Sequence, residues 1–227
     1  MAQQITLPPL VRGQWFPMTS EEFDEWAPDG MKAEWVNGRG MVYMTNSEPH
    51  TLLCLLFKRL LGTFLDVFDL GTLYDAPFEM RILDGTSRRE PDLFVVLHGR
   101  RHLMRHYYFE GAADFVSEFV SKYNAPTDRI DKFRDYEAAG IPEYLMVDTV
   151  TPAREVEFYR RSEAGRLERV LPDEQGRLHS LVLPGFWFDP EWFRQDPLPN
   201  YQRLMMRIAP EAYRRYLNTI IEEESAE

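Results

Sequence analysis

The chain has 227 residues, of which 44% are hydrophobic and 28% charged, and this composition excludes an intrinsically disordered protein and suffices for one well-buried domain. Its net charge of −11 at pH 7 excludes a surface built throughout for sequence-independent binding to nucleic-acid phosphates, although it leaves room for a local basic cleft. The single cysteine, Cys54, rules out a disulfide within the chain and favours the reducing cytoplasm. No apolar run reaches the roughly 18 residues that span a bilayer, so no membrane partner is expected.

The first part of the chain predicts an arm, a hairpin and a long helix. Residues 1–18 are punctuated by prolines and are expected to form an irregular arm. The segment 32–44 predicts a β-hairpin, with Glu34 in its first strand. Residues 48–68 predict a helix whose apolar side chains cover more than one face, which indicates burial on several sides. His50 lies in the first turn of this helix, where a structural or hydrogen-bonding role is the more common one.

Two strands and a basic segment follow. Strands are predicted near 72–83 and 91–97. Asp92 lies at the entrance of the second strand, where an aspartate often serves only as a turn or cap residue. The next segment, HGRRHLMRHYYFE, carries histidines four residues apart, which would form a metal-binding stripe on a helix. Gly99 weakens a helix there and no carboxylate is in register, so the pattern favours a solvated or phosphate-facing patch. The arginines suited to nucleic-acid contacts are Arg100, Arg101 and Arg105.

The segment from Gly111 to Asp148 predicts a strand, a loop, a helix and a second strand. The strand near 115–120 is apolar except for Ser117 and Glu118. An ionised carboxylate in a core is costly, so Glu118 must be paired, protonated, bound to a cation or open to a cleft. A helix is expected from Asp128 to Gly140, with Asp128 and Lys132 one turn apart on one face. We therefore expect the Lys132 side chain to face Glu118.

The end of the chain predicts antiparallel strands and then two helices. A strand near 141–147 is followed by segments that pair as an antiparallel meander. From residue 197 onward the pattern changes to two helices, the second starting at Pro210. The apolar face of the last helix includes Tyr216 and Ile220 and needs a partner, within the chain or in a second copy. We expect a homodimer.

Asp92, Glu118 and Lys132 together could perform metal-dependent phosphodiester hydrolysis. Magnesium is typically held by one or two carboxylates with water and substrate phosphate, and the cation lowers the pKa of its water and stabilises charge on a phosphoryl oxygen. A lysine beside it can orient or help deprotonate that water. The structural alternative is a buried salt bridge between Glu118 and Lys132, with Asp92 as a cap. From spacing alone, the structural alternative is slightly favoured.

The order and spacing of these residues resemble the PD-(D/E)XK nuclease superfamily, and within it the Uma-two-type restriction endonuclease family. The resemblance covers about 19–193. Glu34 with Asn37-Gly38 is similar to the E-x-x-D-G signature of the family, and Pro91-Asp92 is similar to its PD element. The further matches are His50 at the start of the first long helix, Glu118 to Ser121 in the E-V-x-S strand, Asp128, Lys132 and Tyr136 in D-x3-K-x3-Y, Gly140 to Asp148 in the strand G-V-P-E-Y-W-L-V-D, and PGFWFD in the closing segment.

The resemblance implies a fold and a division of the chain. The expected fold is α/β (α+β), a restriction-endonuclease-like mixed sheet flanked by helices, with an N-terminal hairpin. Residues 1–18 are assigned to the arm, 19–194 to the nuclease-like domain and 195–227 to a C-terminal helical extension.

The resemblance also implies a function. It implies an endonuclease that uses Mg2+ or Mn2+, held by Asp92 and Glu118, to hydrolyse phosphodiester bonds in DNA. Lys132 would take the place of the lysine that related enzymes carry two residues after the glutamate, where this chain has Val120. Glu34 would be an auxiliary carboxylate.

The chain departs from the family pattern at two places. The S-P-S after the strand is Ser121-Lys122-Tyr123, and the P-D-L before it is Ala113-Asp114-Phe115. Lys122 has the same strand parity as Glu118, which makes it a rival of Lys132. The alternative function is a nuclease fold that lacks catalysis and serves as a dimeric scaffold or nucleic-acid-binding module.

Overall fold

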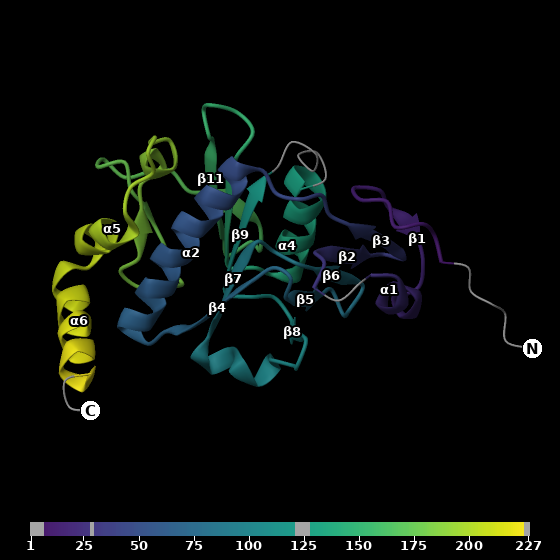
Figure 1. Ribbon diagram of the computed structural model, residues 1–227, viewed down its shortest axis with the longest axis horizontal. Coiled ribbons are helices and arrows are strands. Elements are labelled where there is room, and N and C mark those ends of the chain that lie inside the picture. The colour runs from purple at the N-terminus through teal and green to yellow at the C-terminus, as the bar shows by residue number, and fades with distance from the viewer. Residues whose placement is uncertain (1–6, 28–29, 121–127, 225–227) are drawn as a thin grey trace, which may run out of the picture.

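The computed structural model describes residues 7–27, 30–120 and 128–224 as two mixed sheets flanked by helices, which confirms the predicted fold class (Figure 1). The first six-stranded sheet has the order β1 (Phe16–Pro17), β3 (Arg39–Val42), β2 (Ala33–Val36), β6 (Ser87–Arg89), β5 (Glu79–Ile82) and β8 (Tyr108–Glu110). The second has the order β12 (Leu167–Arg169), β11 (Val156–Arg161), β10 (Glu143–Asp148), β9 (Phe115–Val120), β7 (Leu93–Leu97) and β4 (Gly71–Asp75). A separate pair is formed by β13 (Leu178–His179) and β14 (Trp187–Phe188).

The helices begin and end at residues whose chemistry favours these boundaries. The long α2 (Glu48–Phe68) begins after Ser47, whose side chain accepts a hydrogen bond from the His50 N–H. The expected helix near 128–140 consists of a π-helical turn (Asp128–Lys132) that continues into α4 (Phe133–Ala139) and ends at Gly140 in the left-handed conformation, with φ 86°. The other helices are α1 (Ser20–Trp26), α5 (Tyr201–Ile208), α6 (Pro210–Glu224) and the 3-10 helices His98–Leu103 and Pro190–Phe193.

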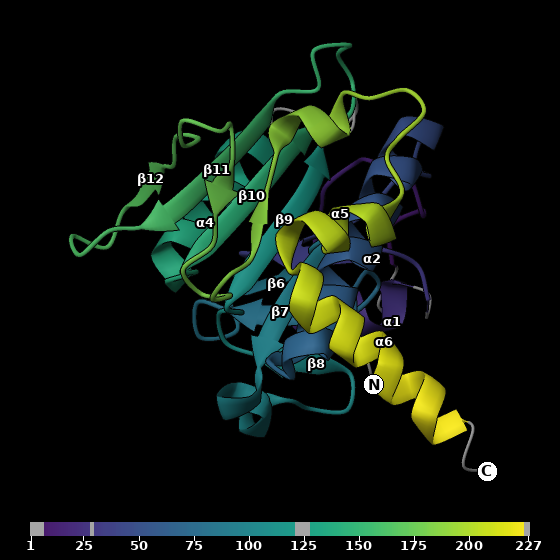
Figure 2. The same cartoon turned by 90° about the vertical axis from the view of Figure 1, so that its left-hand side faces the viewer.

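The second sheet is buried on both faces, and this burial positions the polar residues of its strands. Residues Phe115 and Phe119 of β9 join α2 and β14 in one apolar cluster. Residues Val116 and Val120 join Tyr136 of α4 in another, which also includes Met80 from the first sheet. The two clusters lie on opposite sides of the sheet, with α2 and α5 on one side and α4 on the other (Figure 2). Since side chains alternate along a strand, Glu118 must point to the α4 side.

Two expectations are corrected. The single strand predicted near 72–83 is two strands, β4 and β5, which belong to different sheets; Pro77, which lacks the N–H that a ladder needs, stands between them. The arm is not wholly irregular, because β1 pairs with β3. The histidine segment forms a short 3-10 helix, so the histidine stripe that the sequence analysis disfavoured is not present in the described residues.

The C-terminal helices find part of their partner within the chain. Leu204 and Met205 of α5 and Tyr213 of α6 are buried in the same apolar cluster as α2. The helices therefore pack against α2 in the apolar cluster that also covers the second sheet (Figure 2). Within the described ranges, no helix is long and apolar enough to cross a membrane.

Candidate active site

Adjacent strands of the second sheet bring Asp92 and Glu118 together. Strands β7 and β9 are antiparallel, with Leu93 opposite Ser117, so Asp92 and Glu118 are the next facing pair. Facing residues on antiparallel strands have Cβ atoms about 4.5–5.5 Å apart. The Phe119 N–H also donates to Asp92 Oδ2 over 2.7 Å. Both carboxylates are buried, which concentrates negative charge at the entrance of β7.

Lys132 joins the two sheets through carboxylates on each. Its Nζ lies 3.0 Å from Glu118 Oε1 in the second sheet and 3.1 Å from Glu34 Oε1 on β2 of the first sheet. One turn further along α4, the Tyr136 hydroxyl donates to Glu118 Oε1 over 2.7 Å. Lys132 and Glu34 are fully buried. The expected approach of Lys132 to Glu118 is therefore present, and Glu34 belongs to the same cluster.

Two residues that the sequence analysis did not single out hold Glu34. The Tyr43 hydroxyl donates to Glu34 Oε2 over 2.6 Å, and Arg89 Nη1 donates to the same oxygen over 2.8 Å. Burial raises the pKa of Glu34, but the charges of Lys132 and Arg89 outweigh it and bring the pKa to about 2. Glu34 is therefore ionised at neutral pH and can fix the position of the Lys132 ammonium.

A third residue missed by the sequence analysis, Lys32, binds Asp92. Its Nζ lies 2.6 Å from Asp92 Oδ1, while His50 Nε2 lies 3.2 Å from Asp92 Oδ2. Burial raises the pKa of Asp92, but Lys32 and then His50 outweigh it, so the pKa lies well below its ordinary range. Lys32 has the same strand parity as Glu34, and this alternation was the signal that could have identified it.

The carboxylates of Asp92 and Glu118 are the type of ligand that a hard divalent cation prefers. Carboxylate oxygens of Asp92 and Glu118 are the ligands that Mg2+ and Mn2+ prefer, and such sites need only one or two carboxylates besides water and phosphate. Across the described ranges, no three His, Cys, Asp or Glu side chains are grouped so as to hold a metal ion by themselves. The ammonium groups of Lys32 and Lys132 compensate the carboxylate charges.

The other sequence candidates lie apart or beyond the described residues. Asp128 begins the π-helical turn, but its side chain, and all of Lys122, lie outside the described part of the chain. Arg100 binds Asp114 at 3.2 Å, and Arg105 pairs with Glu110. These arginines and Arg101 follow the far end of β7, whose five residues separate them from Asp92 by roughly 15 Å. The basic segment is therefore not part of the carboxylate cluster.

The model of the family described as "Putative restriction endonuclease", Uma2, matches residues 20–191, about three quarters of the chain. The chain belongs to the Uma2 family. This confirms the resemblance found in the sequence. No curated protein matches the chain significantly.

A solved structure has the same fold as this Uma2 protein. It is a protein from Anabaena variabilis described as "a putative nuclease belonging to DUF820", with 15% sequence identity and a TM-score of 0.64. The match covers 78% of this chain and 98% of that chain. At this identity, the likeness shows the fold alone. Helices α5 and α6 lie beyond the residues that the Uma2 model matches.

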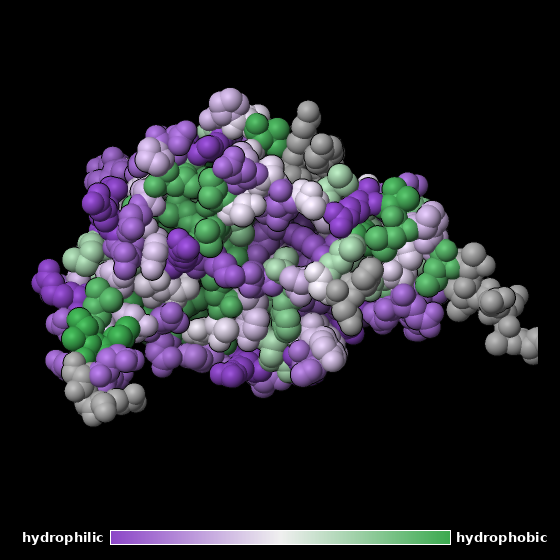
Figure 3. Space-filling view, in the orientation of Figure 1, coloured by the Kyte–Doolittle hydropathy of each residue, from purple (hydrophilic) through white to green (hydrophobic). Residues whose placement is uncertain are grey.

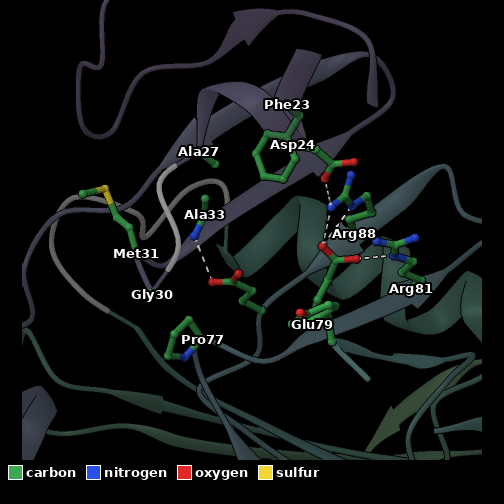
Figure 4. Close-up of a pocket in the computed structure, with 12 residues that line it drawn as sticks. Phe23, Asp24, Ala27, Gly30, Met31, Ala33, Pro77, Glu79, Arg81 and Arg88 are labelled. Carbon is green, nitrogen blue, oxygen red and sulfur yellow. Dashed lines mark hydrogen bonds and ion pairs between the residues drawn. The ribbon is translucent and has the colours of Figure 1, made fainter. Parts of the chain in front are cut away.

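Two pockets lie near strand β2 of this Uma2 protein, and the smaller one reaches the carboxylate cluster. A pocket of about 330 Å³ is lined by Lys32 and Tyr43, which connect the cluster to the surface. A larger one of about 730 Å³ lies beside Ala33, with Glu79 and Arg88 on its polar side (Figure 4). Glu90 lines the larger pocket and accepts a hydrogen bond from the Ala33 N–H over 2.9 Å. Burial raises the pKa of the Glu90 carboxyl to about 8.

Replacing Lys132 with Met should destabilise the protein by about 3–5 kcal/mol, because Glu34 and Glu118 would lose the cation between them in a buried site. The measurement is urea unfolding at pH 7. The control is Lys58→Met, which removes an exposed pair with Asp75 and should cost at most about 1 kcal/mol. Adding Glu118→Gln to Lys132→Met should recover part of the loss. Equal stability of the parent and Lys132→Met would contradict this account of the cluster.

Glu90 should give the metal-free protein a stability that falls as pH rises from about 4.5 to about 8, the ordinary and folded pKa values of this carboxyl. Over that window the folded state keeps a proton that the unfolded state has released, so ionisation favours unfolding. Glu90→Gln should remove this slope, so that its stability relative to the parent increases between pH 5 and pH 9. The free energy of unfolding is measured against pH in a chelating buffer, and Glu168→Gln, at an exposed glutamate, is the control. Parallel pH curves for parent and Glu90→Gln would refute the assignment.

Proposed function

We propose that the protein is an endonuclease that uses Mg2+ or Mn2+ to hydrolyse phosphodiester bonds in DNA. The observation that carries this proposal is the Lys132 ammonium held between Glu118 and Glu34, beside the facing pair of Asp92 and Glu118. Membership of the Uma2 family supports nuclease chemistry in general. DNA, as opposed to RNA, and the identity of the metal belong to the proposal.

Each residue of the cluster has a role in this proposal. Asp92 and Glu118 would hold the cation, which when bound supplies a water of lowered pKa and compensates charge on the phosphate. Lys132 would donate a hydrogen bond to the attacking water or to a phosphate oxygen next to Glu118. Glu34 positions Lys132, and Tyr136 orients the Glu118 carboxylate through the hydrogen bond from its hydroxyl.

His50 and Lys32 act on Asp92 in this proposal. His50 binds one carboxylate oxygen and orients Asp92, while Lys32 balances its charge when no metal is bound. Asp128 and Lys122 keep the secondary roles that the family pattern gives them, with Lys122 as the rival lysine. The basic segment with Arg100, Arg101 and Arg105 would contact nucleic acid away from the cleaved bond.

The remaining parts of the proposal concern the whole chain. Residues 1–18 would be an arm, 19–194 the nuclease-like domain and 195–227 a helical extension. We place the protein in the cytoplasm because a chain with a single cysteine, which cannot form an internal disulfide, is typical of a reducing compartment.

Asp92→Asn and Glu118→Gln should each abolish binding of Mn2+, since each removes one of the two proposed ligand charges. Calorimetric titration of Mn2+ into the parent and both variants measures this without a known substrate. Asp69→Asn, an exposed aspartate at the end of α2, is the control and should bind as the parent does. The same set should then be tested for cleavage of plasmid DNA with Mg2+. Parent-like cleavage by Asp92→Asn would sink the proposal.

Lys32→Met should bind Mn2+ about tenfold more tightly than the parent. In the parent, the Lys32 ammonium is bonded to Asp92 Oδ1 and its positive charge repels Mn2+. The metal-free variant should also melt at a lower temperature, and Mn2+ should raise its melting temperature more than it raises that of the parent. Lys58→Met controls for the loss of one lysine on the surface. Weaker Mn2+ binding in Lys32→Met would show that Lys32 supports the site rather than competing with the cation.

A second candidate function is a scaffold without catalysis. The observation that favours it is that both oxygens of Asp92 are already bonded, one to Lys32 and the other to His50 and the Phe119 N–H. The buried ion pair between Glu118 and Lys132 is also what the purely structural interpretation predicts. Failure of the parent to bind Mn2+ or to cleave DNA would favour the scaffold.

A further inference from the structure

The pocket of about 330 Å³ that reaches the carboxylate cluster has a basic lining on an acidic protein. Two of its side chains, Arg12 and Lys32, are cations, and three others, Tyr43, Thr45 and Asn46, are neutral hydrogen-bonding groups. Among the described residues, no Asp or Glu lines it, although the chain carries 37 Asp and Glu against 26 Lys and Arg. Figure 3 shows a hydrophilic hollow near the middle of this face of the molecule, between α2 and the first sheet. Such a lining attracts an anion.

The backbone holds Arg12 at the rim of this pocket. Arg12 forms a β-bridge with Val42 at the end of β3, and the neighbouring Gly13 N–H donates to the Val42 carbonyl over 2.7 Å. The Arg12 side chain is exposed, and within the described ranges it makes no ion pair and no hydrogen bond. A guanidinium carries five N–H donors in a planar fork. Arg12 therefore presents a full set of donors from a fixed point of the chain.

Lys32 connects the pocket to the carboxylate cluster. Its Nζ lies 2.6 Å from Asp92 Oδ1 and 5.1 Å from the centre of the Tyr43 ring, and its side chain is 18% exposed. An ammonium has three donors, so Lys32 keeps donors for a ligand in the pocket while it binds Asp92. A charge-assisted hydrogen bond spans about 2.8 Å, so an anion bonded to Lys32 would lie within roughly 6 Å of Asp92.

We propose that Arg12 and Lys32 bind a phosphate group of the DNA backbone in this pocket, at the mouth of the carboxylate cluster. The inference rests on the proposed function for its ligand, DNA. A phosphate offers several acceptor oxygens, and an arginine fork with a lysine point charge is a common way to bind it. Thr45 and Asn46, in the loop before α2, carry the neutral donors that often complete phosphate contacts. The donors come from three segments of the chain, as the several oxygens of one phosphate require.

The shared position of Lys32 gives the phosphate site a signature. Lys32 lies between Asp92 and the pocket, so its ammonium repels a cation at Asp92 and attracts an anion in the pocket. Loss of Lys32 should therefore affect the two ligands in opposite directions. Arg12 has no contact with the described carboxylates, so its loss should affect the phosphate alone.

The first experiment measures the affinity of the full chain for a short fluorescent DNA duplex in a chelating buffer, where no metal-dependent cleavage occurs. Arg12→Gln should weaken binding about tenfold, as expected for one lost charge-assisted contact. It should also reduce the slope of log K against log salt by about 0.9, the value for one phosphate contact. The weakening should be equal for duplexes of different sequence, because a phosphate carries no sequence information.

Two matched variants accompany Arg12→Gln. Arg203→Gln removes an exposed arginine of α5 that also lacks an ion pair among the described residues, and it should bind the duplex as the parent does. Arg12→Lys keeps the charge but loses the fork, so it should recover part of the affinity and the full salt slope. Circular dichroism should be the same for all variants.

The second experiment compares two ligands on two variants. Lys32→Met should bind the duplex about tenfold more weakly and Mn2+ more tightly than the parent. Arg12→Gln should bind the duplex more weakly and Mn2+ as the parent does. A variant that had merely lost its structure would lose both ligands, so the opposite signs for Lys32→Met identify a residue shared between them.

The third experiment identifies the source of the phosphate. Inorganic phosphate should displace the duplex from the parent only at millimolar concentration, since it makes one of the several contacts that a duplex makes. Displacement by micromolar inorganic phosphate would assign the pocket to free phosphate and overturn the proposal. Parent-like affinity and salt slope in Arg12→Gln, or a parent that binds no duplex, would overturn it as well. Loss of Mn2+ binding or of cleavage bears on the proposed function alone, because the duplex affinity is measured without metal.

Discussion

The rest of the structure depends on the buried ion pairs of Lys132. Its ammonium contacts Glu118 in one sheet and Glu34 in the other, so a single side chain from the helical segment between β9 and β10 ties the two sheets together. Removing a charge from water costs several kcal/mol, and an ion pair offsets this cost only when its geometry is good and further hydrogen bonds satisfy the charged groups. Here Arg89 and Tyr43 bind the second oxygen of Glu34, and the Tyr136 hydroxyl binds Glu118. The polar cluster is thus stable only as a whole, which explains why residues from five elements of the fold converge on it.

The same network defines what the site could do. Apolar residues pack on both sides of β9, so Glu118 and Asp92 sit where water is scarce and charge interactions are strong. The depressed pKa values of Glu34 and Asp92 mean that both carboxylates are ionised at neutral pH. Lys32 satisfies part of that charge and reaches the pocket of about 330 Å³. A cation or phosphate arriving from this pocket would therefore meet Lys32 first, and the contact of Lys32 with Asp92 is the first that it would displace.

Much of this arrangement could be predicted from the sequence because it depends on local patterns. Helix α2 and the Gly140 terminus of α4 follow from periodicity and capping, and the approach of Lys132 to Glu118 follows from a strand followed by a helix. Arg89 and Lys32 were missed because their contacts join segments 55 and 60 residues apart in the chain, and strand alternation could have given the side of Lys32 but not its partner. Tyr43 lies nine residues from Glu34, within the predicted hairpin, and nothing in the hairpin pattern marks its hydroxyl as a partner of Glu34. The division of 72–83 into β4 and β5 was missed for a related reason. Both pieces have strand-like sequences, and only the pairing partners, β7 for one and β6 with β8 for the other, reveal that they belong to different sheets.

Helix α2 links the carboxylate cluster to the C-terminal helices. It begins at His50, which contacts Asp92, and its 21 residues carry it roughly 30 Å toward the helices of the C-terminal extension (Figure 1). One side of α2 completes the core against the second sheet, and another is covered by α5 and α6. The extension therefore covers apolar surface on α2 that water would otherwise meet, and it does so without touching the carboxylate cluster. A substitution on the outer face of α6 should therefore leave the geometry around Lys132 unchanged, since the length of α2 lies between them.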